Sequence, residues 1–207
     1  MNKNAETIKN ALLTYKGLRE AADARIKQIR ETYGEEAGRA EAEIQSKRLS
    51  QARATAESTI QNAHGEGRRA AEAWGTLDGS KLTDDIKLLD AGLVDREAFN
   101  GLKTRYKDNA TMLSALRKYG EKKNAEAAKE IRDSGDAFTA ALSEPFELRD
   151  IPTAADKMNR WDKAKSSALD LLDAMDGAGK YANPNDWAAA FTKAAMPETL
   201  EHFGENL

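Results

Sequence analysis

Residues 4–40 read NAETIKNALLTYKGLREAADARIKQIRETYGEEAGRA, and this stretch decides the fold. Its apolar residues recur at steps of four and three, the heptad spacing that lines one face of a helix. The stretch contains no proline, and most other positions hold Ala, Glu, Lys, Arg or Gln, which are good helix formers. We therefore predict an all-α protein that begins with a long, coiled-coil-like helix over residues 1–74. The seam residues expected to bind a second copy or a partner helix are Ile8, Leu12, Tyr15, Ile26, Ile29 and Tyr33.

The apolar seam of this helix needs a cover, because a single helix cannot bury its own stripe. Later helices of the same chain, a second copy or another protein can each supply it, and the sequence leaves the three open. An unbroken helix of this length would reach ~100 Å at ~1.5 Å per residue, beyond the diameter of a compact domain of this mass. Gly34 and Gly38 permit a bend, whereas Gly65 and Gly67 are the expected break in the helix.

The composition limits the size of the core and the class of the protein. Of 207 residues, 40% are hydrophobic, 32% charged and 6% aromatic, which favours an extended helical assembly over a large globular core. The net charge of −3 argues against nucleic-acid binding by the whole chain. The chain has no cysteine, so disulfides and thiolate metal sites are excluded. Because no segment approaches the ~20 apolar residues that cross a bilayer, and residues 1–10 lack the apolar core of a secretion signal, we expect a cytoplasmic protein without membrane contact.

Residues 75–142 are predicted to form a module of short helices after a turn-rich hinge at residues 75–80. Polar capping residues separate three amphipathic helices, and the third is expected to continue to about Ile131. The expected N-caps are Thr83, Asp95 and Asn109, and Gly92 is the expected stop of the first helix.

Residues 143–207 are predicted to form a C-terminal helical hairpin with an aromatic core. Thr153 and Asp156 have the spacing of a capping box and open an amphipathic helix that is expected to end at Gly177 and Gly179. The aromatic side chains of this segment either form the core of the hairpin or dock a partner, since Trp is enriched at binding hot spots. The candidate docking aromatics are Trp161, Trp187 and Phe191.

No residue pattern in the chain predicts catalysis, a cofactor or a metal ion. His64 and His202 are the only histidines, and neither has acids or further ligands at the spacing of a metal site. Asp170, Asp173 and Asp176 share one rim of a predicted helix, but they lack the alternation of a calcium loop and are expected to be solvated. We therefore predict a protein that is not an enzyme and has no catalytic, cofactor-binding or metal site.

Two runs within Leu82–Tyr119 carry a family resemblance. The runs are LTDDIKLLDAGL at residues 82–93 and YKDNATML at residues 106–113. They resemble a module in helical proteins encoded among the structural genes of tailed bacteriophages, and this implies a role in the virion or in head assembly. The chain as a whole is also similar to phage scaffolding proteins, although its C-terminal segment is acidic where their capsid-binding helices tend to be basic.

The sequence thus favours a non-enzymatic phage structural protein that acts through helix–helix contacts, as a scaffold-like protein or a capsid-associated component. Its expected partners are itself, as a homo-oligomer, and capsid or other virion proteins, in the host cytoplasm or the virion. One alternative is a helical nucleic-acid-binding protein that uses the basic residues 95–123, where residues 109–119 would imitate a reading helix. Nucleic acid is nevertheless not an expected partner, because few groups that read bases accompany these cations. The other alternative is an adaptor or inhibitor of a host protein.

Overall fold

The computed structural model describes residues 2–134 and 146–180, and all regular structure in these ranges is helical. The predicted all-α class is therefore confirmed. The chain divides into two compact units, residues 1–69 together with the chain from residue 158 onward, and residues 70–157. This division differs from the three consecutive domains predicted from sequence, because a late helix joins the N-terminal helices.

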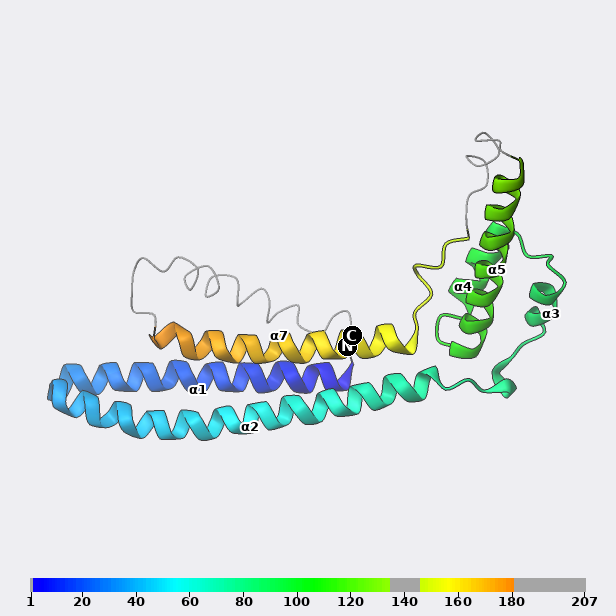
Figure 1. The fold of residues 1–207 in the computed structure, drawn as a ribbon. Coiled ribbons are helices and arrows are strands. Elements are labelled where there is room, and N and C mark those ends of the chain that lie inside the picture. Colours follow the sequence, from blue (N-terminus) through cyan, green and yellow to red (C-terminus); the bar gives the residue numbers. More distant parts are fainter. Residues whose placement is uncertain (1, 135–145, 181–207) are drawn as a thin grey trace. The chain divides into compact units, whose positions relative to one another are not determined.

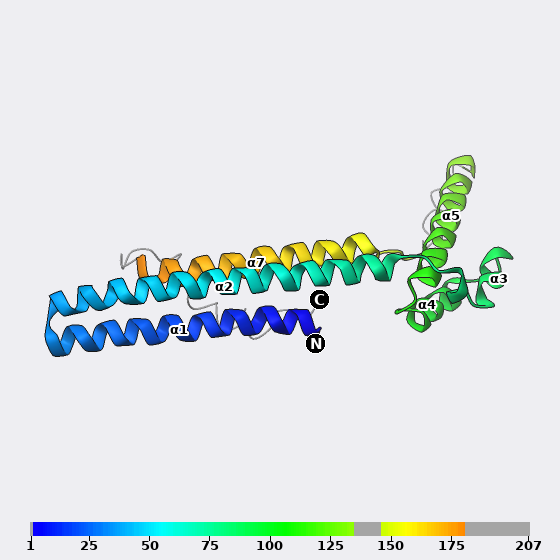
Figure 2. The same cartoon turned by 90° about the horizontal axis from the view of Figure 1, so that it is seen from below.

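The first unit is formed by α1 (Lys3–Tyr33), α2 (Glu35–Gly75) and α7 (Ala154–Lys180), which lie side by side (Figure 1 and Figure 2). The predicted long N-terminal helix is thus present as two helices folded back on each other. Gly34 separates them with a φ of 91°, a left-handed conformation that favours glycine. Its N–H donates to the carbonyl oxygen of Arg30 at 3.0 Å, which closes α1.

The predicted break at Gly65 and Gly67 is wrong, since α2 continues through both glycines. The absence of a side chain at Gly67 serves packing instead. A Cβ atom built there would overlap the indole ring of Trp161 on α7. The indole ring of Trp161 therefore packs directly against the backbone of α2 at Gly67.

The core of the first unit combines large side chains of all three helices with buried alanines, and the alanines allow close helix approach. The α7 helix thus buries its apolar face on the α1–α2 hairpin, so it is not confined to a C-terminal hairpin. The buried residues are Ala5, Ile8, Leu12, Tyr15 and Ala22 of α1, Ala56, Ile60 and Ala63 of α2, and Trp161, Ala168, Leu171, Leu172 and Met175 of α7.

The second unit contains the short helix η1 (Gly79–Lys81), then α3 (Asp85–Asp90), α4 (Arg96–Arg105) and α5 (Ala110–Ser134). The α5 helix includes Ile131, as predicted. The rings of Phe99 and Phe146 meet edge to face in the core, with centroids 5.0 Å apart. Other buried members of this core are Leu89, Val94, Leu102, Leu113, Leu116, Tyr119 and Ile151.

Most of the predicted helix ends are confirmed. Asp95 accepts from the Ala98 N–H at 2.8 Å, and Asn109 accepts from the Met112 N–H at 3.2 Å. The predicted capping box also forms, because the Asp156 N–H donates to Thr153 Oγ1 at 3.0 Å and the Thr153 N–H donates to the Asp156 carboxylate at 2.9 Å.

Two predicted helix ends are wrong. Thr83 does not cap α3; its hydroxyl forms a hydrogen bond with the Tyr106 hydroxyl at 2.8 Å, and Asp84 occupies the cap position. The α7 helix does not end at Gly177, because it continues to Lys180. A single helical glycine costs only ~1 kcal/mol, which packing elsewhere along α7 offsets.

Candidate functional site

The predicted seam divides into a covered and an uncovered part. Ile8, Leu12 and Tyr15 are buried inside the first unit, so the chain itself covers this part of the seam. Ile26 and Ile29 are half-buried, and Tyr33 is 73% exposed beside the α1–α2 turn. The exposed part of the seam therefore lies toward the α1–α2 turn.

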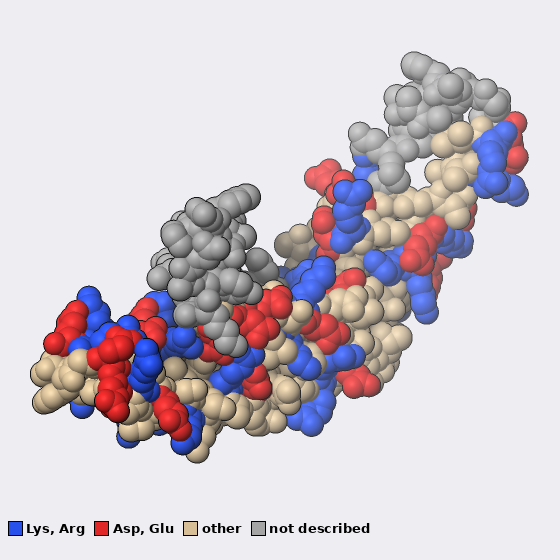
Figure 3. Space-filling view, turned by 60° about the vertical axis from the view of Figure 1, so that its left-hand side comes forward, with Lys and Arg blue, Asp and Glu red and all other residues tan. Residues whose placement is uncertain are grey.

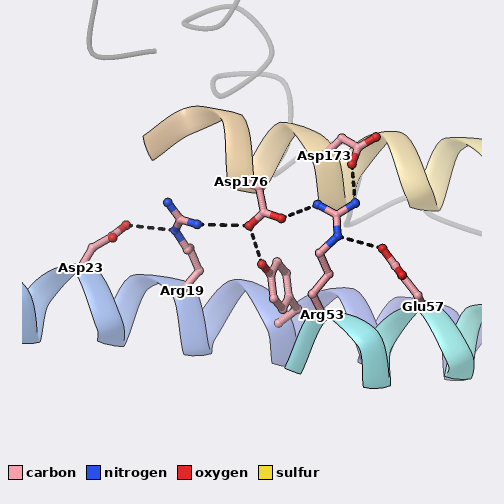
Figure 4. A network of polar contacts seen from close by, with 7 residues as sticks. Arg19, Asp23, Arg53, Glu57, Asp173 and Asp176 are labelled. Carbon is pink, nitrogen blue, oxygen red and sulfur yellow. Dashed lines mark hydrogen bonds and ion pairs between the residues drawn. The ribbon is translucent and has the colours of Figure 1, made fainter. Parts of the chain in front are cut away.

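A polar network fastens α7 to both helices of the hairpin (Figure 4), and we call it the polar clasp. The Asp176 carboxylate accepts from the Tyr15 hydroxyl and from Arg53, and it also accepts from Arg19 Nη1 at 3.1 Å. Arg53 also donates to Asp173. The polar clasp comprises Tyr15, Arg19, Arg53, Asp173 and Asp176.

The contacts of the polar clasp shift the pKa values of Tyr15 and Asp176. Burial raises the pKa of Tyr15 to about 12, and the hydrogen bond to Asp176 adds to this effect. Burial also opposes ionisation of Asp176, but the hydrogen bonds from Tyr15 and Arg53 outweigh it, and the pKa of Asp176 lies below its ordinary value. The carboxylate is therefore ionised and the phenol neutral at pH 7, the pair of states in which the Tyr15 hydroxyl donates.

A second polar contact joins α2 to α7 near Trp161. His64 Nε2 lies 2.7 Å from Asp162 Oδ1, and Arg68 Nη1 donates to the same oxygen at 3.2 Å. The bond to His64 lowers the pKa of the half-buried Asp162. This pairing was not predicted, because His64 and Asp162 are 98 residues apart in the chain.

Acid titration tests these contacts. The folded-state pKa of Asp176 is lowered, so its contribution to stability is present above its unfolded pKa of about 3.9 and is lost as the pH falls through the lower folded value. We expect Asp176→Asn to flatten the profile of unfolding free energy against pH below about pH 4. Asp170→Asn, at an exposed aspartate of the same helix, is the control and should keep the wild-type slope. Identical slopes for both variants would contradict the role of the clasp.

Of the aspartates predicted to be solvated, Asp170 and Asp173 are exposed and Asp176 is half-buried. Asp173 and Asp176 also form ion pairs with Arg53. Within residues 2–134 and 146–180, no group of three His, Cys, Asp or Glu side chains is placed to hold a metal ion. The helices of the same ranges include none that is long and apolar enough to cross a membrane.

One face of the α1–α2 hairpin is hollowed along its length, and we call this hollow the outer groove. It consists of two adjoining parts with volumes of about 550 and 530 Å³, and Leu18 and Ala52 line both parts. Each of these residues directly precedes an arginine of the clasp, so it lies about 100° around its helix from the face that α7 covers. No residue of α7 lines either described part.

The outer groove has the chemistry of a helix-binding surface. Its lining repeats at steps of three and four on both helices and is mostly small or apolar. Leu18 and Ile44 are 48% and 49% exposed, which is unusual for apolar side chains of this size at one site. The lining residues are Thr7, Asn10, Ala11, Thr14, Tyr15, Leu18, Ala21, Ala22 and Arg25 of α1 and Glu41, Ile44, Gln45, Arg48, Leu49, Ala52, Thr55, Ala56 and Thr59 of α2.

Comparisons of the chain with protein-family models, curated proteins and solved structures find no match. Function is therefore inferred from the surfaces of the two units. Charges of both signs are interspersed on the face shown in Figure 3, so no broad single-sign field marks a binding site there.

Several of the basic residues in 95–123 are paired with acids of the second unit. Arg105 Nη1 lies 2.9 Å from Asp85 Oδ2, and Lys103 Nζ lies 3.7 Å from Asp150 Oδ2. The expected reading helix is the start of α5, whose apolar side is buried in the core. These contacts leave fewer free cations than the sequence count implies.

Of the candidate docking aromatics, only Trp161 lies within the described residues. Trp161 is 4% exposed and fills the space above Gly67, so it is a core residue. Trp187 and Phe191 lie outside the residues that the structure describes. The seam predicted from sequence did not include the outer groove. The groove corresponds to a second repeat of small and apolar residues on α1, offset from that seam, which includes Ala11, Thr14 and Leu18.

Proposed function

We propose that this chain is a non-enzymatic structural protein that works in assembly through helix–helix contacts. The single observation that carries the proposal is the outer groove, which offers two parallel rows of small and apolar residues to a further helix. Such a surface on a three-helix unit is completed by a fourth helix, as in a helical bundle. Within residues 2–134 and 146–180 only α1 and α2 line the groove, and its lining is mostly small or apolar, so it suits a protein partner.

The proposed setting is a phage-type particle, as a scaffold-like or capsid-associated protein. The resemblance of residues 82–119 to helical proteins encoded among phage structural genes supports this setting. The partner is a second copy of the chain or another particle protein, and light scattering separates the two. Co-expression with the coat protein of the same genome, followed by sedimentation of assembled particles, tests the setting itself.

The groove predicts the association behaviour of the chain. We expect the purified protein to form oligomers at tens of micromolar, and Leu18→Lys combined with Ile44→Lys to abolish them, because charged side chains would be buried unpaired in the contact. Size-exclusion chromatography with light scattering measures the mass of each variant.

The control for this prediction is Leu13→Lys. Leu13 is also exposed on α1, but it does not line the outer groove, so this variant should associate like the wild type. If the wild type stays monomeric and the coat protein binds it and the groove variant equally, the proposed function is contradicted.

A further inference from the structure

A second groove lies between α3 and α5 in the second unit. Its volume is about 310 Å³. The apolar part of its lining belongs to the edge of the core, where Leu89 and Tyr119 are buried and Ile86 and Ala115 are partly buried. The remaining lining residues are Asp90, Gly92, Lys118, Lys122 and Lys123.

The C-terminal end of α3 closes beside this groove. The N–H of Leu93 donates to the carbonyl oxygen of Leu88 at 3.1 Å, and that of Gly92 donates to Leu89 at 3.1 Å, with a φ of 71° at Gly92. This is the bonding of a Schellman motif, and it fixes Gly92 in the lining of the groove. Leu88 and Leu93 are exposed, at 46% and 73%, but neither lines the groove, and Leu88 lies about 160° around α3 from Ile86.

The charge at the groove is positive. Lys118 and Lys122 are one helical turn apart on α5 and therefore point to the same side. Lys122 is 74% exposed, and its Nζ is 3.9 Å from Glu126 Oε1. Lys123 is engaged more closely, with Nζ 3.1 Å from Glu126 Oε2 and 5.9 Å from the centre of the Tyr119 ring. The lining thus holds three lysines and one acid, Asp90, while Glu126 outside the lining pairs with two of the lysines.

We propose that this groove binds an acidic, amphipathic helix of a partner protein. The apolar floor would take the apolar side of that helix, and Lys118 and Lys122 would pair with its carboxylates. The α5 residues of the lining, from Ala115 to Lys123, rise by ~12 Å, so about two turns of the partner fit. A nucleic-acid backbone fits less well, because it would leave the apolar floor without a partner and would face Asp90.

The test uses the full-length chain and three labelled probes at low and high salt. One probe is a synthetic helical peptide of about 14 residues with leucines on one face and glutamates on the other. The second has lysines in place of the glutamates, and the third is a DNA duplex. We expect only the acidic peptide to bind, and Lys118→Glu combined with Lys122→Glu to weaken its binding about ten-fold or more, since like charges would meet across the contact.

The matched control is Lys129→Glu, at an exposed lysine of the same helix that does not line the groove. It should bind the acidic peptide like the wild type, and unchanged circular dichroism of all variants confirms folding. Equal binding of the acidic and basic peptides, or indifference to the charge reversal, would overturn the proposal. Preferred binding of the duplex would assign the cations to nucleic acid instead, and a homodimer broken by the same reversal would assign the groove to a second copy.

Discussion

Gly67→Ala is expected to destabilise the three-helix unit by about 1–3 kcal/mol. Alanine at an exposed helix position usually stabilises, but a Cβ atom here would overlap the indole ring of Trp161. That ring is buried and belongs to another helix, so it has no free space into which it can turn. Urea denaturation followed by circular dichroism measures the loss, and hydrogen exchange of α2 and α7 assigns it to this unit.

Gly65→Ala is expected to have the opposite effect on the free energy of unfolding, although it lies in the same helix. No atom beyond its own helix and chain neighbours lies within 4 Å of a Cβ built at residue 65, so this variant should gain up to ~1 kcal/mol. In a Trp161→Ala background, which alone should cost about 3–5 kcal/mol, Gly67→Ala should no longer destabilise. Equal stabilisation by alanine at both glycines would show that α7 does not pack on Gly67.

Alkaline pH is expected to remove about 2–3 kcal/mol of stability through Tyr15 alone. The folded-state pKa of this phenol is raised to about 12, above the unfolded value of 10, by burial and by the bond to Asp176. Its contribution is therefore complete below about pH 10 and is lost as the pH rises through about 12, with roughly half of the loss present by pH 11. Once ionised, the buried phenolate would face the Asp176 carboxylate.

Tyr15→Phe isolates this effect, because the variant has no group to titrate in the clasp. Its free energy of unfolding, measured by urea denaturation at several pH values from about 9 to 11.5, should fall less steeply than that of the wild type. Tyr33→Phe removes an exposed phenol from the same helix and should follow the wild type. If Tyr15→Phe and the wild type lose stability in parallel, Tyr15 is not the group responsible.

The sequence by itself determined the helices and most of their ends. Heptad spacing and strong helix formers produce α1 and α2, and local hydrogen bonds fix caps such as Asp95, Asn109 and the Thr153–Asp156 box. These features depend on residues within one or two turns of each other, so they can be inferred without knowing the fold. The family resemblance and the association of the chain remain predictions.

The tertiary structure alone decided which surfaces are covered and which glycine interrupts the helix. Gly34 and Gly67 look alike in the sequence, but the first supports a left-handed turn and the second makes room for Trp161. Likewise, Asp176 belongs to a regular acidic rim until α7 packs on the hairpin and places it against Tyr15 and Arg53. Such contacts join residues more than 90 positions apart, and the heptad pattern is satisfied equally by a helix of the same chain or of another. Only the packing of α7 shows that one face is filled and that, among the described residues, no third helix lines the outer groove.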